Sequence, residues 1–198
     1  MTTARLEAFA DGVFAIAVTL LVLLIEVPKG GDEGLGHALA AQWPQYLAYV
    51  LSFATIGIMW VNHHAVLEHF DRVDRAFLFL NLGLLMCIAF APFPTALVAE
   101  HLHERDAALA YGIALTVTAC FFNGVWHYGR LRLLRPDADM REVRGITRSY
   151  VPGPFMYAGA ALVAFASAPA SVALYGAIAA VYVSASVWAG GEAEISSR

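Results

Sequence analysis

Long apolar runs alternate with short polar connections along the whole chain. A helix needs about 20 residues to cross the hydrocarbon core of a bilayer. Segments that meet this length lie at residues 6–27, 45–66, 76–99, 107–129, 150–168 and 171–190. Only a few residues around Pro169 separate the last two, which indicates a tight hairpin. The pattern predicts an all-α integral membrane protein, a single domain over residues 1–198 with six transmembrane helices.

Composition supports this class of protein. Of the 198 residues, 60% are hydrophobic and 14% are charged, whereas charged residues make up about a quarter of an average soluble domain. The formal net charge of −4 argues against a basic surface for nucleic acid, so no nucleic-acid partner is expected. Cys87 and Cys120 lie within apolar runs, which indicates packed thiols rather than a disulfide framework or a zinc motif. We expect a multi-pass protein of the cell inner (plasma) membrane, in contact with membrane lipid.

The distribution of positive charge predicts the orientation, because cytoplasmic loops carry an excess of Lys and Arg. If the N-terminus is cytoplasmic, the outside receives only Lys29 and Arg105. The inside then receives Arg5, Arg72, Arg75, Arg130, Arg132, Arg135, Arg141, Arg144, Arg148 and Arg198. This asymmetry predicts that the N- and C-termini are both cytoplasmic.

The first predicted helix has two specialised faces. At 100° per residue, one stripe contains Gly12, Ile16, Thr19, Leu20, Leu23 and Val27. Asp11 points away from this stripe. A carboxylate in a spanning helix costs up to about 3 kcal/mol, so it usually faces a cavity or a partner. Periodicity alone leaves two alternatives open for each feature: the stripe is a packing face or a pore wall, and Asp11 is a helix cap or a buried partner for donors on other helices.

Polar groups also occur at a similar depth in the second and third predicted helices. Residues 60–64 read Trp-Val-Asn-His-His, and Asn81 lies in the third helix. His63 and His64 point about 100° apart, so hydrogen bonds to carbonyls or to Asp11 are favoured over a tightly bound metal. A secondary transporter or proton-coupled protein that uses Asp11 and His63 or His64 is the alternative function. Transporters typically show inverted repeats and broken helices, which this sequence lacks apart from two prolines in the third helix.

The first helix carries a long motif. Arg5, Phe9 and the run Asp11-Gly12-Val13-Phe14-Ala15-Ile16-Ala17 resemble the signature of the transmembrane protein 175 family of potassium channels. Residues 60–64 and 81–95 resemble the family's second and third helices, and the rest of the chain resembles it in topology only. The resemblance implies a homotetramer of six-helix chains, with the first helices lining a central pore and no carbonyl selectivity filter.

The same resemblance implies roles for individual residues. It places a hydrophobic constriction and gate at Ile16, Leu20 and Leu23, and a hydroxyl layer for cation preference at Thr19. It places a structural and gating network at Arg5, Asp11, Trp60, His63, His64 and Asn81. The implied activity is a weakly selective, potassium-preferring channel for monovalent cations, with no cofactor and no enzymatic reaction. Ala10 stands where the family has a serine, so gating or selectivity is expected to differ.

Overall fold

The computed structural model describes residues 3–28 and 34–196, with side chains as far as residue 185, and its regular elements are helices. They are α1 (Thr3–Leu20), the 3₁₀ helix η1 (Leu21–Leu24), α2 (Gly34–Ala41), α3 (Trp43–Glu68), α4 (Arg75–Phe90), α5 (Pro92–Glu100), α6 (Arg105–Arg132), α7 (Met140–Tyr150), α8 (Gly153–Val163) and α9 (Ala168–Ser196). The prediction of an all-helical protein is confirmed.

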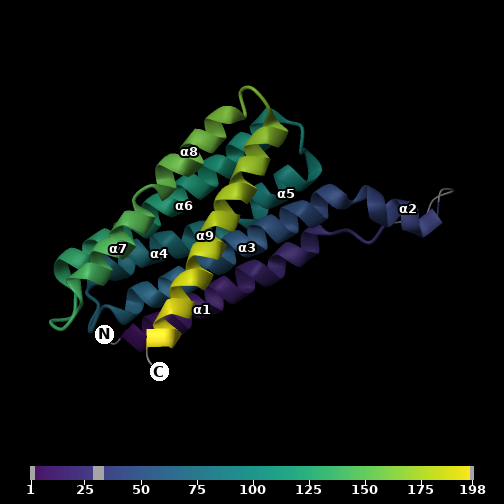
Figure 1. Cartoon of the computed structure of the whole chain (residues 1–198). Coiled ribbons are helices and arrows are strands. Elements are labelled where there is room, and N and C mark those ends of the chain that lie inside the picture. Colours follow the sequence, from purple (N-terminus) through teal and green to yellow (C-terminus); the bar gives the residue numbers. More distant parts are fainter. Residues whose placement is uncertain (1–2, 29–33, 197–198) are drawn as a thin grey trace.

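The helices form a bundle in which α1, α3, α4, α6 and the shorter α8 run side by side and α9 crosses one face (Figure 1). The start of α1 and the end of α9 lie at the same end of the bundle, whereas α2 extends beyond the other end (Figure 1). Among the described residues, five segments are long and apolar enough to cross a membrane: Thr3–Leu24, Trp43–Glu68, Arg75–Glu100, Arg105–Arg132 and Ala168–Ala185.

The segment expected at residues 150–168 is shorter than predicted. Its helix, α8, has 11 residues. Helix α7 occupies the chain as far as Tyr150, and α8 begins only after Pro152. Proline lacks the N–H of a continuing helix and suits the first turn of a new one. The third predicted helix is likewise divided at Ala91 into α4 and α5, since Pro92 and Pro94 interrupt its backbone hydrogen bonds.

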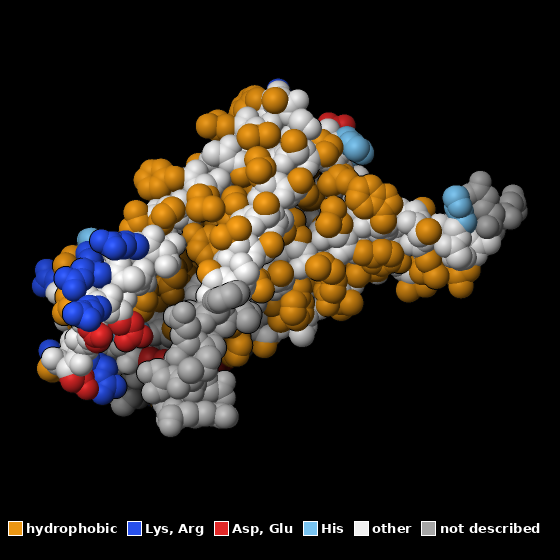
Figure 2. All heavy atoms as spheres, in the orientation of Figure 1, with side chains coloured by type: hydrophobic (Ala, Val, Ile, Leu, Met, Phe, Trp, Pro, Cys, Tyr) orange, Lys and Arg blue, Asp and Glu red, His pale blue; other side chains and the backbone are white. Residues whose placement is uncertain are grey.

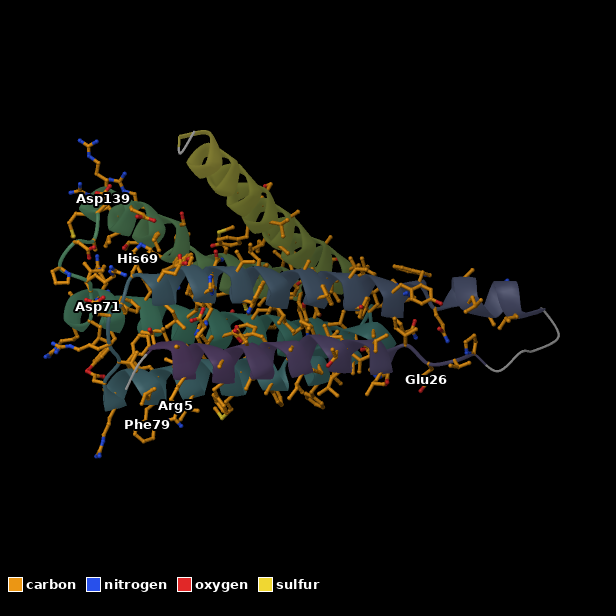
Figure 3. All side chains as sticks on the ribbon, turned by 90° about the horizontal axis from the view of Figure 1, so that it is seen from below. Arg5, Glu26, His69, Asp71, Phe79 and Asp139 are labelled. Carbon is orange, nitrogen blue, oxygen red and sulfur yellow. The ribbon has the colours of Figure 1, made fainter. Side chains whose placement is uncertain are left out.

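Charges gather at the ends of the bundle, and apolar side chains cover its length. Figure 2 shows Lys and Arg concentrated at one end, with hydrophobic side chains over most of the remaining visible face. In Figure 3, Arg5, Asp71 and Asp139 lie at this end, whereas Glu26 lies at the other. Large apolar residues such as Phe79 and Phe155 are 73% and 76% exposed. Apolar surface of this kind is what a bilayer accommodates.

A polar cap fixes the start of α4 at the charged end. The Asp74 carboxylate accepts a hydrogen bond from the Phe77 N–H at 2.8 Å and a second from the Tyr128 hydroxyl at 2.7 Å. These two donors, in that order, hold the pKa of the Asp74 carboxyl below its ordinary value of 3.8. Nearby, the Phe70 ring lies against Gly129 of α6, where any larger residue would overlap it.

Candidate functional site

Helix α1 buries one face in the bundle and leaves the other exposed. The buried face consists of Leu6, Ala10, Phe14 and Ala17, continued by Leu21 of η1, and none of these is more than 4% exposed. It packs against α3 and α4. A helix with an apolar residue every three or four positions on one side packs that side onto its neighbours.

The opposite face is the stripe found by periodicity, which we call the α1 stripe: Gly12, Ile16, Thr19, Leu20, Leu23 and Val27. Every one of these residues is exposed, with Ile16 at 60%, Leu20 at 42% and Leu23 at 72%. The α1 stripe is therefore not the face by which α1 packs within its own chain. It faces whatever surrounds the bundle: lipid, another copy of the chain, or water.

Asp11 anchors α1 to α3. Its Oδ1 accepts a hydrogen bond from Trp60 Nε1 at 2.8 Å, and Asp11 itself is half-buried. The partner of Asp11 is thus the tryptophan one turn before the histidines, rather than His63 or His64. A groove of about 560 Å³ lies beside this contact, lined by Asp11, Phe14, Ala15, Val18, Phe53, Ile56, Gly57, Trp60 and Val61.

His63 lies in the core where α1, α3 and α4 meet. Its Nε2 is 2.7 Å from Asn81 Oδ1, and the two residues are 1% and 0% exposed. The rings of His63 and Phe14 have centroids 5.6 Å apart. The Asn81 Nδ2 is buried and has no hydrogen-bond partner within the described residues. This pair connects α3 to α4 directly beneath α1.

His64 faces a different carboxylate. Its Nδ1 lies 2.6 Å from Glu7 Oε1, and its Nε2 lies 3.6 Å from Glu68 on its own helix. Glu7 was not among the residues proposed from sequence. Its spacing of four residues before Asp11 placed it on the same face of the helix, which was the available signal. Arg5 is exposed and makes no hydrogen bond or ion pair within the described part of the chain.

Apart from Arg5, the residues of the expected network therefore make three separate contacts between helices: Asp11 with Trp60, His63 with Asn81, and His64 with Glu7. A further buried polar cluster escaped sequence analysis. Ser52 Oγ lies 2.8 Å from the Thr95 hydroxyl and 2.9 Å from the Tyr111 hydroxyl, which joins α3, α5 and α6 beside the break at Ala91. Hydroxyl-bearing residues are common on packed helices in membranes, so nothing in the sequence set these apart.

A helical bundle with apolar sides, charged ends and several helices able to cross a membrane defines a multi-pass membrane protein. The chain belongs to the transmembrane protein 175 (TMEM175) family. The family model described as "Endosomal/lysosomal potassium channel TMEM175" matches residues 5–92. A potassium channel of Streptomyces collinus is 48% identical over 185 residues, which is 90% of each chain. The resemblance seen in the first-helix motif is thereby confirmed.

Other relatives agree with this assignment. The crystal structure of a lysosomal potassium-selective channel TMEM175 homolog from Chamaesiphon minutus has 42% sequence identity and a TM-score of 0.84, and the match covers 91% of this chain and 96% of that one. The endosomal/lysosomal proton channel TMEM175 of Homo sapiens is 44% identical over 86 residues, 39% of this chain and 17% of that one. These relatives are channels rather than enzymes.

Proposed function

We propose that this protein is a potassium-preferring, weakly selective channel for monovalent cations in the cell inner membrane. One observation carries the proposal: α1 buries one face in its own bundle and exposes the α1 stripe, Ile16 at 60% and Leu23 at 72%. The potassium channels of Streptomyces collinus and Chamaesiphon minutus, whose sequences are 48% identical to this chain over 185 and 172 residues, support the choice of ion.

A single exposed helix cannot enclose a path, so the proposal requires several copies around an axis. A homotetramer with four α1 helices at its centre brings four α1 stripes together. The groove beside Asp11 and Trp60 offers the next copy an apolar surface adjoining the stripe. Six crossings by each chain, with α8 as the fifth, would leave both termini on the arginine-rich cytoplasmic side.

Within this pore, Ile16, Leu20 and Leu23 would form successive apolar rings. Such rings can gate by excluding water, so hydrated ions pass only when the pore widens. A filter of backbone carbonyls is disfavoured along most of α1, because its carbonyls accept helical hydrogen bonds as far as Ile16, four residues before the helix ends at Leu20. Thr19 supplies an oxygen instead: its hydroxyl donates to the Ile16 carbonyl at 2.9 Å, which leaves lone pairs of the oxygen for a cation.

The contacts between α1 and α3 suit a gating role. Asp11 with Trp60, and Glu7 with His64, both lie on the part of α1 that precedes the proposed constriction. A rotation or tilt of α1 that widens the apolar rings would have to break or rearrange these contacts. Arg5, also in this part of α1, is exposed and so available to a neighbouring copy.

The test is cation flux into liposomes that contain the purified chain. Ile16→Asn places a polar group in the proposed constriction and should raise basal potassium flux several-fold by wetting it. Ile113→Asn is the matched control, because Ile113 on α6 is the same residue type and equally exposed, at 59% against 60% for Ile16. Unchanged flux for Ile16→Asn, or an equal rise for both variants, would contradict the gate.

Proton-coupled function is the second candidate, and the burial of His63 against Asn81 beside α1 favours it. The human relative is a proton channel by name. In the same liposomes, an internal pH dye would report proton movement with potassium absent. His63→Gln should abolish this movement if His63 relays protons, and should leave it unchanged if His63 only connects α3 to α4.

A further inference from the structure

Helix α7 is a short amphipathic helix between α6 and α8, at the charged end of the bundle (Figure 1). Val143 is fully buried and Tyr150 is 9% exposed. Trp126 of α6 donates a hydrogen bond from Nε1 to the Thr147 hydroxyl at 3.0 Å, and its ring packs edge-on against Tyr150. One face of α7 is therefore packed on α6, and the opposite face points away from α6.

That opposite face carries three arginines with a glycine at one side of them. Arg141, Arg144 and Arg148 are all exposed, and at 100° per residue they fall within about 60° of one another on the helix surface. Gly145 lies beside them, about 40° from Arg141, and a Cβ added there would meet nothing within 4 Å. We call these four residues the arginine cradle: three cations beside a spot where a ligand can approach the backbone.

Within the part of the chain whose side chains are described, no carboxylate neutralises the cations of the cradle. Within the described residues, the guanidinium groups of Arg141, Arg144 and Arg148 make no ion pair. The acidic residue of α7, Glu142, lies 3.5 Å from His69 instead. On α6, one turn after Trp126, the Nε of Arg130 is buried and has no hydrogen-bond partner among the described residues. Guanidinium groups bind phosphate and carboxylate through paired N–H donors, so this surface suits an anion.

The depth of the cradle identifies the kind of anion. Val151 and Phe155 follow Arg148 by three and seven residues, and they are 50% and 76% exposed. Apolar surface suited to lipid thus begins within one turn of the cradle. In Figure 2 the cluster of Lys and Arg at this end directly adjoins hydrophobic side chains. A border between a cationic end and an apolar side is where the headgroups of phospholipids lie.

We propose that the arginine cradle binds the headgroup of an anionic phospholipid, such as phosphatidylglycerol, and so ties the connection between α6 and α8 to the bilayer. The arginines supply the charge and the paired donors for the lipid phosphate. Gly145 supplies the room for the phosphate to approach the helix.

The test measures which lipid occupies the cradle in a bilayer. The full chain, with Cys87→Ala and Cys120→Ala, carries a bimane label on Ser149→Cys, an exposed position at the edge of the cradle. Vesicles of phosphatidylcholine contain a fixed fraction of brominated phosphatidylglycerol or brominated phosphatidylcholine, and quenching reports the local lipid. We expect an apparent preference for phosphatidylglycerol over phosphatidylcholine of at least about fivefold. This is the factor that corresponds to the attraction of a single arginine to an anionic lipid surface.

The variants separate the cradle from general positive charge. Arg141→Gln, Arg144→Gln and Arg148→Gln together should reduce the preference to near one, whereas the three lysine replacements should keep part of it. The matched control removes the same charge from exposed sites at the same end, through Arg72→Gln, Arg75→Gln and Arg132→Gln, and should keep more than half of the preference.

Several results would overturn the proposal. The first is a preference for phosphatidylglycerol near one in the parent protein, and the second is an equal loss of this preference in the two triple glutamine variants. The third is retention of the parent preference by Gly145→Glu, because the added carboxylate repels the lipid phosphate while every arginine is intact. Gly145→Glu also decides the matter if a glutamine triple fails to give a single peak in gel filtration. If the protein binds poly-glutamate through the cradle and shows a preference for phosphatidylglycerol near one, the ligand of this surface is an acidic protein rather than a lipid.

Discussion

The hydrogen bond between Trp60 and Asp11 offers a direct test of what holds α1 in place. Trp60→Phe keeps an aromatic ring on α3 but removes the N–H that reaches the Asp11 carboxylate at 2.8 Å. We expect the bundle to lose stability, because the carboxylate stays half-buried in a spanning helix without that donor. The groove beside the contact should also change shape, so assembly of the proposed tetramer is a second readout.

The size of the effect follows from the burial of the pair. A hydrogen bond to a charged group contributes about 1.5–3 kcal/mol in proteins, whereas polar contacts between membrane helices average about 0.6 kcal/mol and reach about 1.7. Trp60 is 43% exposed, which favours the lower range. We therefore expect Trp60→Phe to lower the free energy of unfolding by about 1 kcal/mol, a factor of about five in the equilibrium constant.

The assay is unfolding by SDS in mixed micelles, followed by far-ultraviolet circular dichroism so that loss of a tryptophan does not change the signal. Trp43→Phe is the control: Trp43 begins α3, is 53% exposed and makes no side-chain hydrogen bond within the described residues. It should lower the stability by less than about 0.5 kcal/mol. A double-mutant cycle with Asp11→Ala isolates the coupling between the two side chains.

A coupling energy within error of zero would refute this reasoning, as would equal losses for Trp60→Phe and Trp43→Phe. In the first case, water or lipid headgroups rather than Trp60 would stabilise the Asp11 carboxylate. In the second, the loss would come from removing indole bulk on α3 and would say nothing about the hydrogen bond.

Three shorter predictions follow from other features. Thr19→Ala should lower the ratio of potassium to sodium flux in liposomes, and Thr19→Ser should preserve it. An equal ratio in Thr19→Ala and in the parent would contradict a role of the Thr19 hydroxyl in cation preference. Gly129→Ala should cost about 1–3 kcal/mol in the SDS assay because its Cβ would overlap the Phe70 ring, whereas Gly124→Ala, 3.9 Å from Leu80, should be neutral or stabilising. The pKa of Asp74 is lowered in the folded protein, so the stabilisation by this cap is complete above the ordinary pKa of 3.8 and is lost as pH falls through the folded pKa. Asp74→Asn should therefore make the thermal midpoint depend less steeply on pH in this acid range. A pH dependence equal to that of the parent would contradict the cap.

The apolar runs predicted the long helices to within a few residues, because length and hydropathy alone decide which segments can lie in lipid. Helix α7 was missed for the same reason. Its arginines mark it as a polar connection, and the spacing of Val143, Thr147 and Tyr150 shows an inner face only once α6 is in view. The break at Pro152 was visible in the sequence, but a proline in an apolar run does not by itself say whether a helix bends or ends.

Within the candidate site, too, some features could be predicted from sequence and others could not. The α1 stripe follows from periodicity within one helix, which any straight helix obeys. The partner of Asp11 depends on how far α3 slides along α1, and a shift of one turn would exchange Trp60 for His64. The pairing of Glu7 with His64 depends on the same register. Sequence spacing fixes which side chains share a face, but it does not fix the height at which two helices meet.

The 3₁₀ turn at the end of α1 has a consequence for the spacing of the proposed rings. An α-helix rises about 1.5 Å per residue, so Leu20 lies about 6 Å along the axis from Ile16. If the helix continued unchanged, Leu23 would follow after only about 4.5 Å. Because Leu21–Leu24 form a 3₁₀ helix, with a rise of about 2.0 Å per residue, Leu23 instead lies about 6 Å beyond Leu20. The change of helix type makes the two axial intervals equal, so a permeating ion would meet apolar rings at a regular pitch.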